Sequence, residues 1–258
     1  MSRVSHSSVL AYVLHQRAYR ETSAIVEVIT REYGRVGVVA RGIRSSAKNR
    51  SALTPFQRYW LQWKEQGELQ RLEKWETDGV AHRLQGTTLV SGLYVNELLL
   101  KLIERHDPHA LLYDAYQDTV GALATGTMRP GIALRWFEMA LLSAIGYGPD
   151  FSHERDGETP LSPDACYGFE PDEGAYRCAP DSPGLQIKGT TLLALASGQL
   201  TDASQLREAK ALMRMLIQYR LQDRTIVSRT LFRAGERERA KTIGLQTAED
   251  GTRNMPAC

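Results

Sequence analysis

Side chains that could bind a metal gather in one stretch of the sequence. His153, Asp156, Cys166, Cys178 and Asp181 are all residue types that bind zinc. A convincing zinc site would show two Cys-x2-Cys pairs, whereas the pairs here are His153-x2-Asp156 and Cys178-x2-Asp181, which contain a single thiolate. Such a set would bind zinc poorly. We therefore expect a metal-free loop without a cofactor, with residual metal affinity as the alternative.

The sequence carries no recognisable catalytic signature. It lacks G-x-S-x-G, G-x4-G-K-[ST] and H-E-x-x-H, and its six histidines are scattered. We therefore predict that the protein is not an enzyme. Three cysteines argue against a disulfide scaffold and favour a reducing compartment. No run approaches the roughly 18 apolar residues of a membrane span, and no signal-peptide pattern opens the chain, so we expect a cytoplasmic protein without membrane contact.

Positive charge is concentrated near the N-terminus. Residues 1–60 carry ten basic and three acidic side chains, a net of +7, and because the whole chain has a net charge of +2 the remainder sums to −5. Between Glu32 and Glu65 there are seven cations and no carboxylate. Arginine-rich segments of this density favour a polyanion-binding surface, with a merely solvated basic surface as the alternative. Residues 148–183 are the opposite, with nine carboxylates against Arg155 and Arg177.

The basic segment belongs to a region that reads as a small β-barrel. Short apolar or alternating runs predict five strands, at residues 9–14, 24–29, 35–40, 56–63 and 69–75. Five short strands without an intervening helix indicate a closed or partly open barrel. A cationic loop between the third and fourth strands fits a protein that binds single-stranded nucleic acid, in which aromatic side chains stack on bases.

The rest of the chain has helical periodicity. Apolar stripes predict helices over 89–103, 111–123, 129–145, 190–196 and 202–219. The irregular acidic segment 148–188 splits them, and residues 242–258 lack periodicity and are predicted to be a mobile tail. Gly92 within the first helix indicates a close approach, either of another helix or of the barrel. The fold class is therefore α+β, with the barrel in residues 1–80 and the helical domain in residues 81–241.

Several separated motifs occur in one order along the chain. They are Val13–Ser23, Thr30–Arg35, Val39–Arg44, Ser91–Leu98, Leu134–Glu138, Gly146–Gly148 and Ser228–Phe232. With these motifs the chain resembles the RecO family of bacterial DNA repair proteins, from about residue 8 to about residue 235. The resemblance implies an N-terminal OB-fold, a helical C-terminal domain and, in some members, a four-cysteine zinc module. Here the positions expected to be cysteine are His153 or Glu154, Asp156, Cys178 and Asp181, which implies the shape of that module without its full ligand set.

The resemblance also implies a recombination mediator that needs no cofactor. Its members bind single- and double-stranded DNA, anneal complementary strands, bind the acidic C-terminal tail of single-stranded DNA-binding protein and help RecR to load RecA. We expect such a protein in the cytoplasm, at the nucleoid. An RNA-binding or ribosome-associated OB-fold protein is the alternative.

Two sets of residues are candidates for these contacts. The residues expected to neutralise DNA phosphates are Arg17, Arg35, Arg41, Arg44, Lys48 and Arg50. Arg135, in the motif Leu-Arg-Trp-Phe-Glu, is expected from the resemblance to bind a carboxylate of the acidic tail beside an apolar pocket. The alternative for Arg135 is an internal ion pair with Glu138, three residues on.

Overall fold

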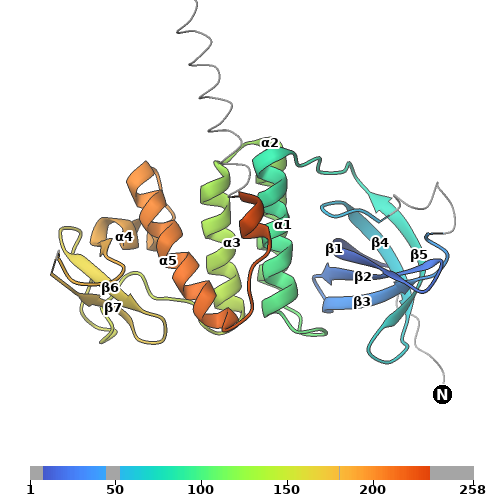
Figure 1. Ribbon diagram of the computed structural model, residues 1–258, viewed down its shortest axis with the longest axis horizontal. Coiled ribbons are helices and arrows are strands. Elements are labelled where there is room, and N and C mark those ends of the chain that lie inside the picture. Colours follow the sequence, from blue (N-terminus) through green and yellow to red (C-terminus); the bar gives the residue numbers. More distant parts are fainter. Residues whose placement is uncertain (1–7, 45–52, 180, 233–258) are drawn as a thin grey trace, which may run out of the picture.

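Five strands of the N-terminal region form a closed barrel. The structure, a computed structural model, describes residues 8–44, 53–179 and 181–232. The barrel strands are β1 (Val9–Tyr19), β2 (Ser23–Thr30), β3 (Gly34–Ala40), β4 (Arg58–Lys64) and β5 (Gln70–Asp78), in the order β1-β2-β3-β5-β4 (Figure 1). Neighbouring strands are antiparallel except β3 and β5, which pair in parallel and close the barrel.

Alternation along the strands gives the barrel a core of its own. Val26 and Val28 of β2 pair with Val38 and Val36 of β3, and all four side chains are buried inside the barrel. Trp63 and Leu61 of β4 fill the same interior. The predicted five-strand barrel is therefore confirmed, and so is the α+β class.

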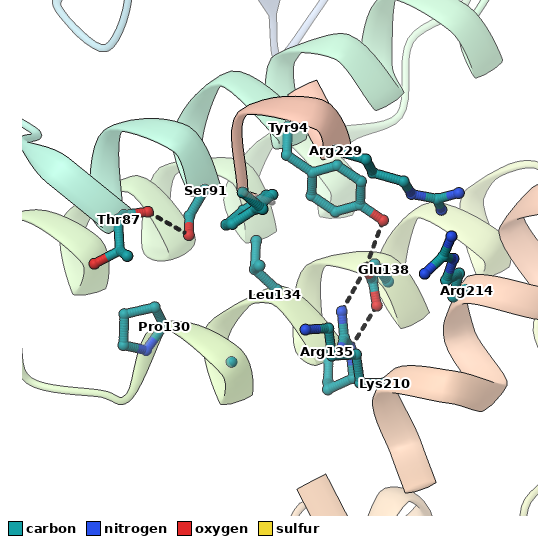
Figure 2. Close-up of a pocket in the computed structure, with 12 residues that line it drawn as sticks. Thr87, Ser91, Tyr94, Pro130, Leu134, Arg135, Glu138, Lys210, Arg214 and Arg229 are labelled. Carbon is teal, nitrogen blue, oxygen red and sulfur yellow. Dashed lines mark hydrogen bonds and ion pairs between the residues drawn. The ribbon is translucent and has the colours of Figure 1, made fainter. Parts of the chain in front are cut away.

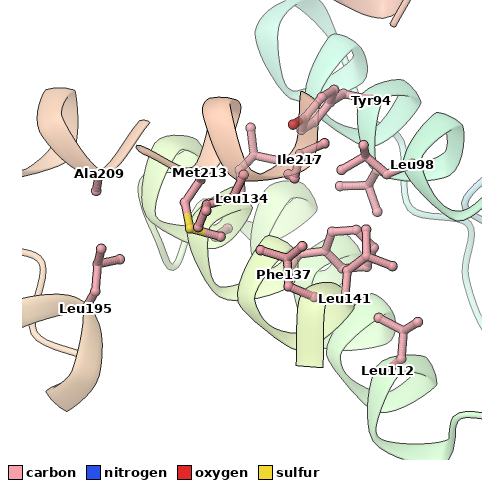
Figure 3. Packing of buried hydrophobic residues seen from close by; sticks show 14 of the residues in the cluster. Tyr94, Leu98, Leu112, Leu134, Phe137, Leu141, Leu195, Ala209, Met213 and Ile217 are labelled. Carbon is pink, nitrogen blue, oxygen red and sulfur yellow. The ribbon is translucent and has the colours of Figure 1, made fainter. Parts of the chain in front are cut away.

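Five helices follow the barrel in the described part of the chain. They are α1 (Gly86–Leu102), α2 (Ala110–Thr125), α3 (Pro130–Ala144), α4 (Gly189–Ser197) and α5 (Ala203–Leu221). Their apolar stripes meet in one core, in which Phe137 and Leu141 of α3 lie near Leu98 of α1 and Ile217 of α5 (Figure 3). Within the ranges described above, no helix has the length and hydropathy to cross a membrane.

The acidic segment predicted to be irregular contains a small sheet. Strands β6 (Cys166–Glu170), β7 (Gly174–Arg177) and β8 (Ile187–Lys188) form an antiparallel sheet in the order β7-β6-β8. One face of this sheet packs into the helical core through Tyr167, Phe169 and Ile187. The helical domain therefore also has a β component that the sequence analysis missed. The predicted tail, residues 242–258, lies outside the described residues.

The barrel and the helices share buried contacts. Tyr12, Leu14 and Ile29 of the barrel pack in the helical core. A register shift between Val13 and His15 interrupts the pairing of β1 with β2, and the Leu14 carbonyl accepts a hydrogen bond of 2.8 Å from Asn96 Nδ2 of α1. The hydroxyl of Tyr116 in α2 donates to Asn96 Oδ1 at 2.8 Å. Asn96 therefore joins one barrel strand to two helices.

Gly92 lies where α1 meets the segment that leads into β4. A Cβ at this position would lie 2.6 Å from Leu84 Cδ1 and 2.8 Å from Phe56 Cε1, which is too close for either atom. Both of these side chains are buried. Of the two predicted reasons for this glycine, packing against the barrel region is therefore the one found.

Candidate nucleic-acid surface and anion pocket

One row of side chains crosses the outer face of the barrel and has a cation at each end. Arg17 of β1 pairs with Ile25 of β2, Ile25 pairs with Val39 of β3, and Val39 pairs with Arg71 of β5. Directly paired residues project to the same face of a sheet. Arg17 is exposed, Arg71 is half-buried, and Ile25 is buried between them. The row is therefore a narrow apolar strip flanked by positive charge.

Arg41 and Arg44 lie beside this row. Ala40, the last residue of β3, pairs with Ala24, and Ala24 also pairs with Ala18, so that Arg41 emerges next to the β1–β2 turn. The Arg44 backbone N–H donates to the Thr22 carbonyl at 2.9 Å, which holds the β3 end against that turn. Both arginines are exposed. Three of the predicted phosphate-binding residues, Arg17, Arg41 and Arg44, therefore share one end of the barrel.

Arg35 lies elsewhere and has internal partners. Its Nη1 lies 3.1 Å from Glu27 Oε2, and its Nε donates to the Ile103 carbonyl at 2.9 Å. Glu27 is buried and also pairs with Arg105, which lies in the loop after α1. Arg35 therefore binds the barrel to the helical domain instead of facing solvent with the other cations. The remaining two predicted residues, Lys48 and Arg50, lie outside the described residues.

Most aromatic side chains of the barrel are structural. Tyr12, Tyr59 and Trp63 are among the largest fully buried side chains. Trp60 is 40% exposed, but its indole N–H donates to Asp78 Oδ1 at 3.0 Å. Tyr19 is partly exposed, and the Arg20 guanidinium lies 5.2 Å from its ring centre. Tyr19, two residues after Arg17 on β1, therefore lies at the same end of the barrel as the exposed arginines.

A second site is a pocket in the helical domain. Its volume is about 430 Å³, and it lies between α1, α3, α5 and the segment that follows α5 (Figure 2). Apolar lining is provided by Pro130, Leu134 and Phe232. Four cations also line it, namely Arg135, Lys210, Arg214 and Arg229. Glu138 is the one carboxylate in the described lining.

Glu138 is fully engaged by its neighbours. Arg135 Nε donates to Glu138 Oε2 and Arg135 Nη2 donates to Glu138 Oε1, both at 2.6 Å, and these side chains are only 5% and 1% exposed. The Tyr94 hydroxyl donates to Glu138 Oε1 at 2.7 Å. Burial, the largest single effect, lowers the pKa of Arg135, but the charge and hydrogen bonds of Glu138 together with Tyr94 outweigh it, so the pKa is raised. The internal ion pair predicted as the alternative for Arg135 is thus present, and it leaves Nη1 outside the pair.

The candidate zinc ligands are not arranged as a zinc site. His153 Nδ1 lies 2.9 Å from Asp150 Oδ2, and Asp156 accepts hydrogen bonds from the backbone and side chain of Thr159. The Cys166 and Cys178 sulfurs lie 3.5 Å apart, and burial together with this neighbouring thiol raises the pKa of Cys178. In the described ranges no three His, Cys, Asp or Glu side chains are grouped to hold a metal ion. These residues therefore do not fit the zinc of the four-cysteine module.

Comparison with known proteins gives the class and then the family. The sequence model described as "Recombination protein O N terminal" matches residues 4–79, and that described as "Recombination protein O C terminal" matches residues 83–230. Together with the barrel and the helical domain, these matches define a protein of DNA recombination and repair. The chain belongs to the RecO family. The family descriptions name recombination.

Individual relatives cover most of the chain. The DNA repair protein RecO of Laribacter hongkongensis (strain HLHK9) is 44% identical over 86% of this chain and 91% of its own length. That of Alkalilimnicola ehrlichii is 42% identical over 86% of this chain and 89% of its own. That of Halorhodospira halophila is 40% identical over 87% of this chain and 95% of its own length. The likeness therefore includes both the barrel and the helical domain.

Proposed function

We propose that this protein is a DNA-binding recombination mediator, acting in the cytoplasm at the nucleoid. It binds single- and double-stranded DNA, anneals complementary strands, and acts with single-stranded DNA-binding protein and RecR to promote RecA loading. The observation that carries the proposal is the group of exposed arginines, Arg17, Arg41 and Arg44, at one end of the barrel. Membership of the RecO family supports the assignment to DNA repair.

The arginine group suits a phosphate backbone. Arginine offers two parallel donors to phosphate, and each neutralised phosphate releases a counterion. Arg71 extends the surface across β5, and Lys48 and Arg50 belong to the same stretch of sequence. Glu27 cannot cancel this charge, because Arg35 and Arg105 already pair with it. Glu21, in the β1–β2 turn, is the carboxylate nearest along the chain.

Charge reversal tests the DNA surface. Arg41→Glu/Arg44→Glu should weaken binding to all sequences alike, because phosphate contacts carry no base information. Each phosphate contact contributes about 0.7 to the slope of log affinity against log salt on single strands, so losing two should flatten it by about 1.4. Fluorescence anisotropy at several salt concentrations measures both quantities.

A matched control separates local contacts from net charge. Arg155→Glu/Arg177→Glu changes the total charge equally, on exposed side chains of the small sheet region. This control should bind DNA nearly as the wild type does. Wild-type affinity and salt slope in the Arg41/Arg44 variant would exclude the proposed surface. Stronger binding of RNA than of DNA in competition would instead favour an RNA-binding protein.

Annealing follows from the same surface. Two strands pair once their mutual repulsion is screened and their base edges remain free, which backbone contacts allow. Any basic protein anneals naked DNA weakly, so the informative substrate is a pair of complementary strands coated with single-stranded DNA-binding protein. We expect annealing of these coated strands by the wild type. A protein that anneals only naked strands would contradict the mediator role.

The anion pocket is the proposed site for the acidic tail of single-stranded DNA-binding protein. An acidic and apolar tail needs a fixed cation and an apolar slot, and Arg135 beside Leu134 and Pro130 offers both. Glu138 holds the Arg135 guanidinium in one orientation. Arg135→Ala should weaken binding of a tail peptide at least tenfold in a titration. An unchanged affinity in a folded Arg135→Ala variant would rule out this role.

A further inference from the structure

The segment after α5, residues 226–232, is fastened across the end of the pocket; we call it the strap. One carboxylate of α1 holds it. Glu97 Oε1 accepts the Val227 backbone N–H at 2.8 Å, and Glu97 Oε2 accepts the Ser228 backbone N–H at 2.8 Å and the Ser228 hydroxyl at 2.7 Å. Ile226 is buried in the helical core. Two sequence motifs that the proposed function leaves unused, around Glu97 and from Ser228 to Phe232, thus meet in one contact.

The strap places Arg229 at the pocket, where part of its guanidinium has no hydrogen-bond acceptor in the described part of the chain. Arg229 Nη1 donates to Gln218 Oε1 at 3.1 Å, and its guanidinium lies 5.9 Å from the centre of the Tyr94 ring. Its Nη2 is buried and has no acceptor among the residues that the structure describes. A buried donor without a partner costs roughly 1–3 kcal/mol, more when charged. Such a group points to an acceptor supplied from outside.

The charges around Arg229 specify the kind of acceptor. Figure 2 shows Arg229, Arg214, Arg135 and Lys210 around Glu138, whose two oxygens are engaged by Arg135 and Tyr94. One carboxylate therefore faces four cations, and the lining has a surplus of positive charge. Phe232 of the strap and Leu134 of α3 make part of the same wall apolar. Carboxylates joined to an apolar side chain fit this lining.

We propose that Arg229 is a second carboxylate-binding residue of this pocket, and that Glu97 is the positioning residue that holds it there through the strap. This inference rests on the proposed function, in which the pocket takes an acidic peptide. The peptide is then held by two arginines from different elements, Arg135 on α3 and Arg229 on the strap, with its apolar side chain between them and the helices.

Titration of a fluorescent acidic tail peptide of single-stranded DNA-binding protein tests the two roles together. Arg229→Ala should weaken binding at least tenfold, and Arg229→Lys should weaken it less. Arg207→Ala, which removes an exposed cation of α5 outside the pocket lining, should stay within twofold of wild type. Circular dichroism confirms that each variant is folded.

Glu97→Gln supplies the readout that separates positioning from general stability. Because Glu97 acts through Arg229, Glu97→Gln alone should lower the affinity for the peptide severalfold. Added to Arg229→Ala, it should lower that affinity little further, because coupled residues give non-additive effects. A full additive effect in the double variant would overturn the positioning role. Wild-type affinity in Arg229→Ala would overturn the carboxylate-binding role.

Two outcomes distinguish this inference from the proposed function. If Arg135→Ala loses the peptide while Arg229→Ala keeps it, only the inference fails. If wild-type protein does not bind the peptide, the assignment of the pocket fails and the inference with it. The inference would also be overturned if Arg229→Ala weakened binding of a short DNA oligonucleotide and not of the peptide. The ligand of Arg229 would then be phosphate.

Discussion

The Arg135–Glu138 pair shows why one arginine can be both buried and available. A buried charge is tolerated when paired, and removing one member leaves the other uncompensated at a cost of about 3–5 kcal/mol. Arg135 meets this condition with two short bonds to Glu138. A loss of peptide binding in Arg135→Ala is therefore informative only with a measured unfolding free energy. The partners of Arg229, Gln218 and Tyr94, are uncharged, so Arg229→Ala leaves no buried charge behind and should cost less stability than Arg135→Ala.

At the same scale, Glu97 makes the strap sensitive to acid. Burial alone would raise the pKa of Glu97, but its hydrogen bonds to Ser228 and Val227 and the charge of Lys101 lower it. Because the folded-state pKa lies below the unfolded value of about 4.3, the contribution of Glu97 to stability is fully present above that value and is lost as the pH falls through the lower one. The difference in unfolding free energy between wild type and Glu97→Gln should therefore be largest near neutral pH.

Urea unfolding between pH 7 and pH 3 measures this difference. Ser228→Ala, which removes one of the three donors and keeps the carboxylate, should show a smaller difference from wild type at neutral pH. A Glu97→Gln difference that is constant over this pH range would show that the ionised carboxylate does not hold the strap.

Among the elements, α1 carries the packing that sets the barrel against the helices. The cost of a mid-helix glycine indicated a close approach at Gly92, but only the structure identifies Phe56 and Leu84 as the neighbours. Leu84 lies outside the predicted strands and helices, and Phe56, the first residue of the predicted fourth strand, precedes β4 in the structure, so periodicity gives neither contact. The prediction for Arg35 rests on its neighbours in sequence, whereas its side chain binds the Ile103 carbonyl after α1 and Glu27, which also pairs with Arg105.

The two mid-helix glycines should respond oppositely to alanine. Gly92→Ala should destabilise the protein by about 1–3 kcal/mol, because the new Cβ overpacks the site and this outweighs the gain in helix propensity. Gly121→Ala in α2, where a Cβ meets nothing within 4 Å, should stabilise it by up to about 1 kcal/mol. Thermal unfolding of the two variants gives the comparison. Equal stabilisation by both would contradict the close packing at Gly92.

The small sheet shows a limit of sequence patterns. Its strands are short, and β8 has two residues, so neither alternation nor composition distinguishes them from a loop. The barrel strands are longer, and the predicted bounds of β2, β3 and β4 agree with the structure to within two residues, whereas β1 continues to Tyr19 and β5 to Asp78, beyond their predicted ends. Arg71 was missed for another reason: its place in the arginine row depends on the parallel pairing of β5 with β3, which no local pattern encodes.

In the whole molecule, the shared core predicts joint unfolding of barrel and helices. Three of the four tryptophans, Trp60, Trp63 and Trp75, lie in the barrel, so tryptophan fluorescence of a Trp136→Phe background reports on the barrel, whereas circular dichroism at 222 nm is dominated by the helices. We expect the two signals to change at the same urea concentration. Asn96→Ala should lower the unfolding free energy by about 2–3 kcal/mol and so move both midpoints to lower urea together, because it leaves the Leu14 carbonyl and the Tyr116 hydroxyl without their bonds.

Separate transitions would contradict this expectation. An Asn96→Ala effect confined to the tryptophan signal would show that the barrel unfolds alone. Gln117→Ala on α2 is a suitable control, because Gln117 also joins a helix to the barrel, through Arg58, but in a less buried contact. Its effect on both midpoints should be smaller than that of Asn96→Ala.

The strap also sets an order of events during protein synthesis. Ser228 bonds to Glu97 across 131 residues, and the pocket lining extends to Phe232. The barrel has a core of its own and leaves the ribosome first, since domains generally fold in the order of their synthesis. A nascent chain therefore presents its arginine surface before its pocket exists. Newly made molecules expose the proposed DNA-binding arginines while still attached to the ribosome, but the proposed peptide site is completed only after the strap has emerged.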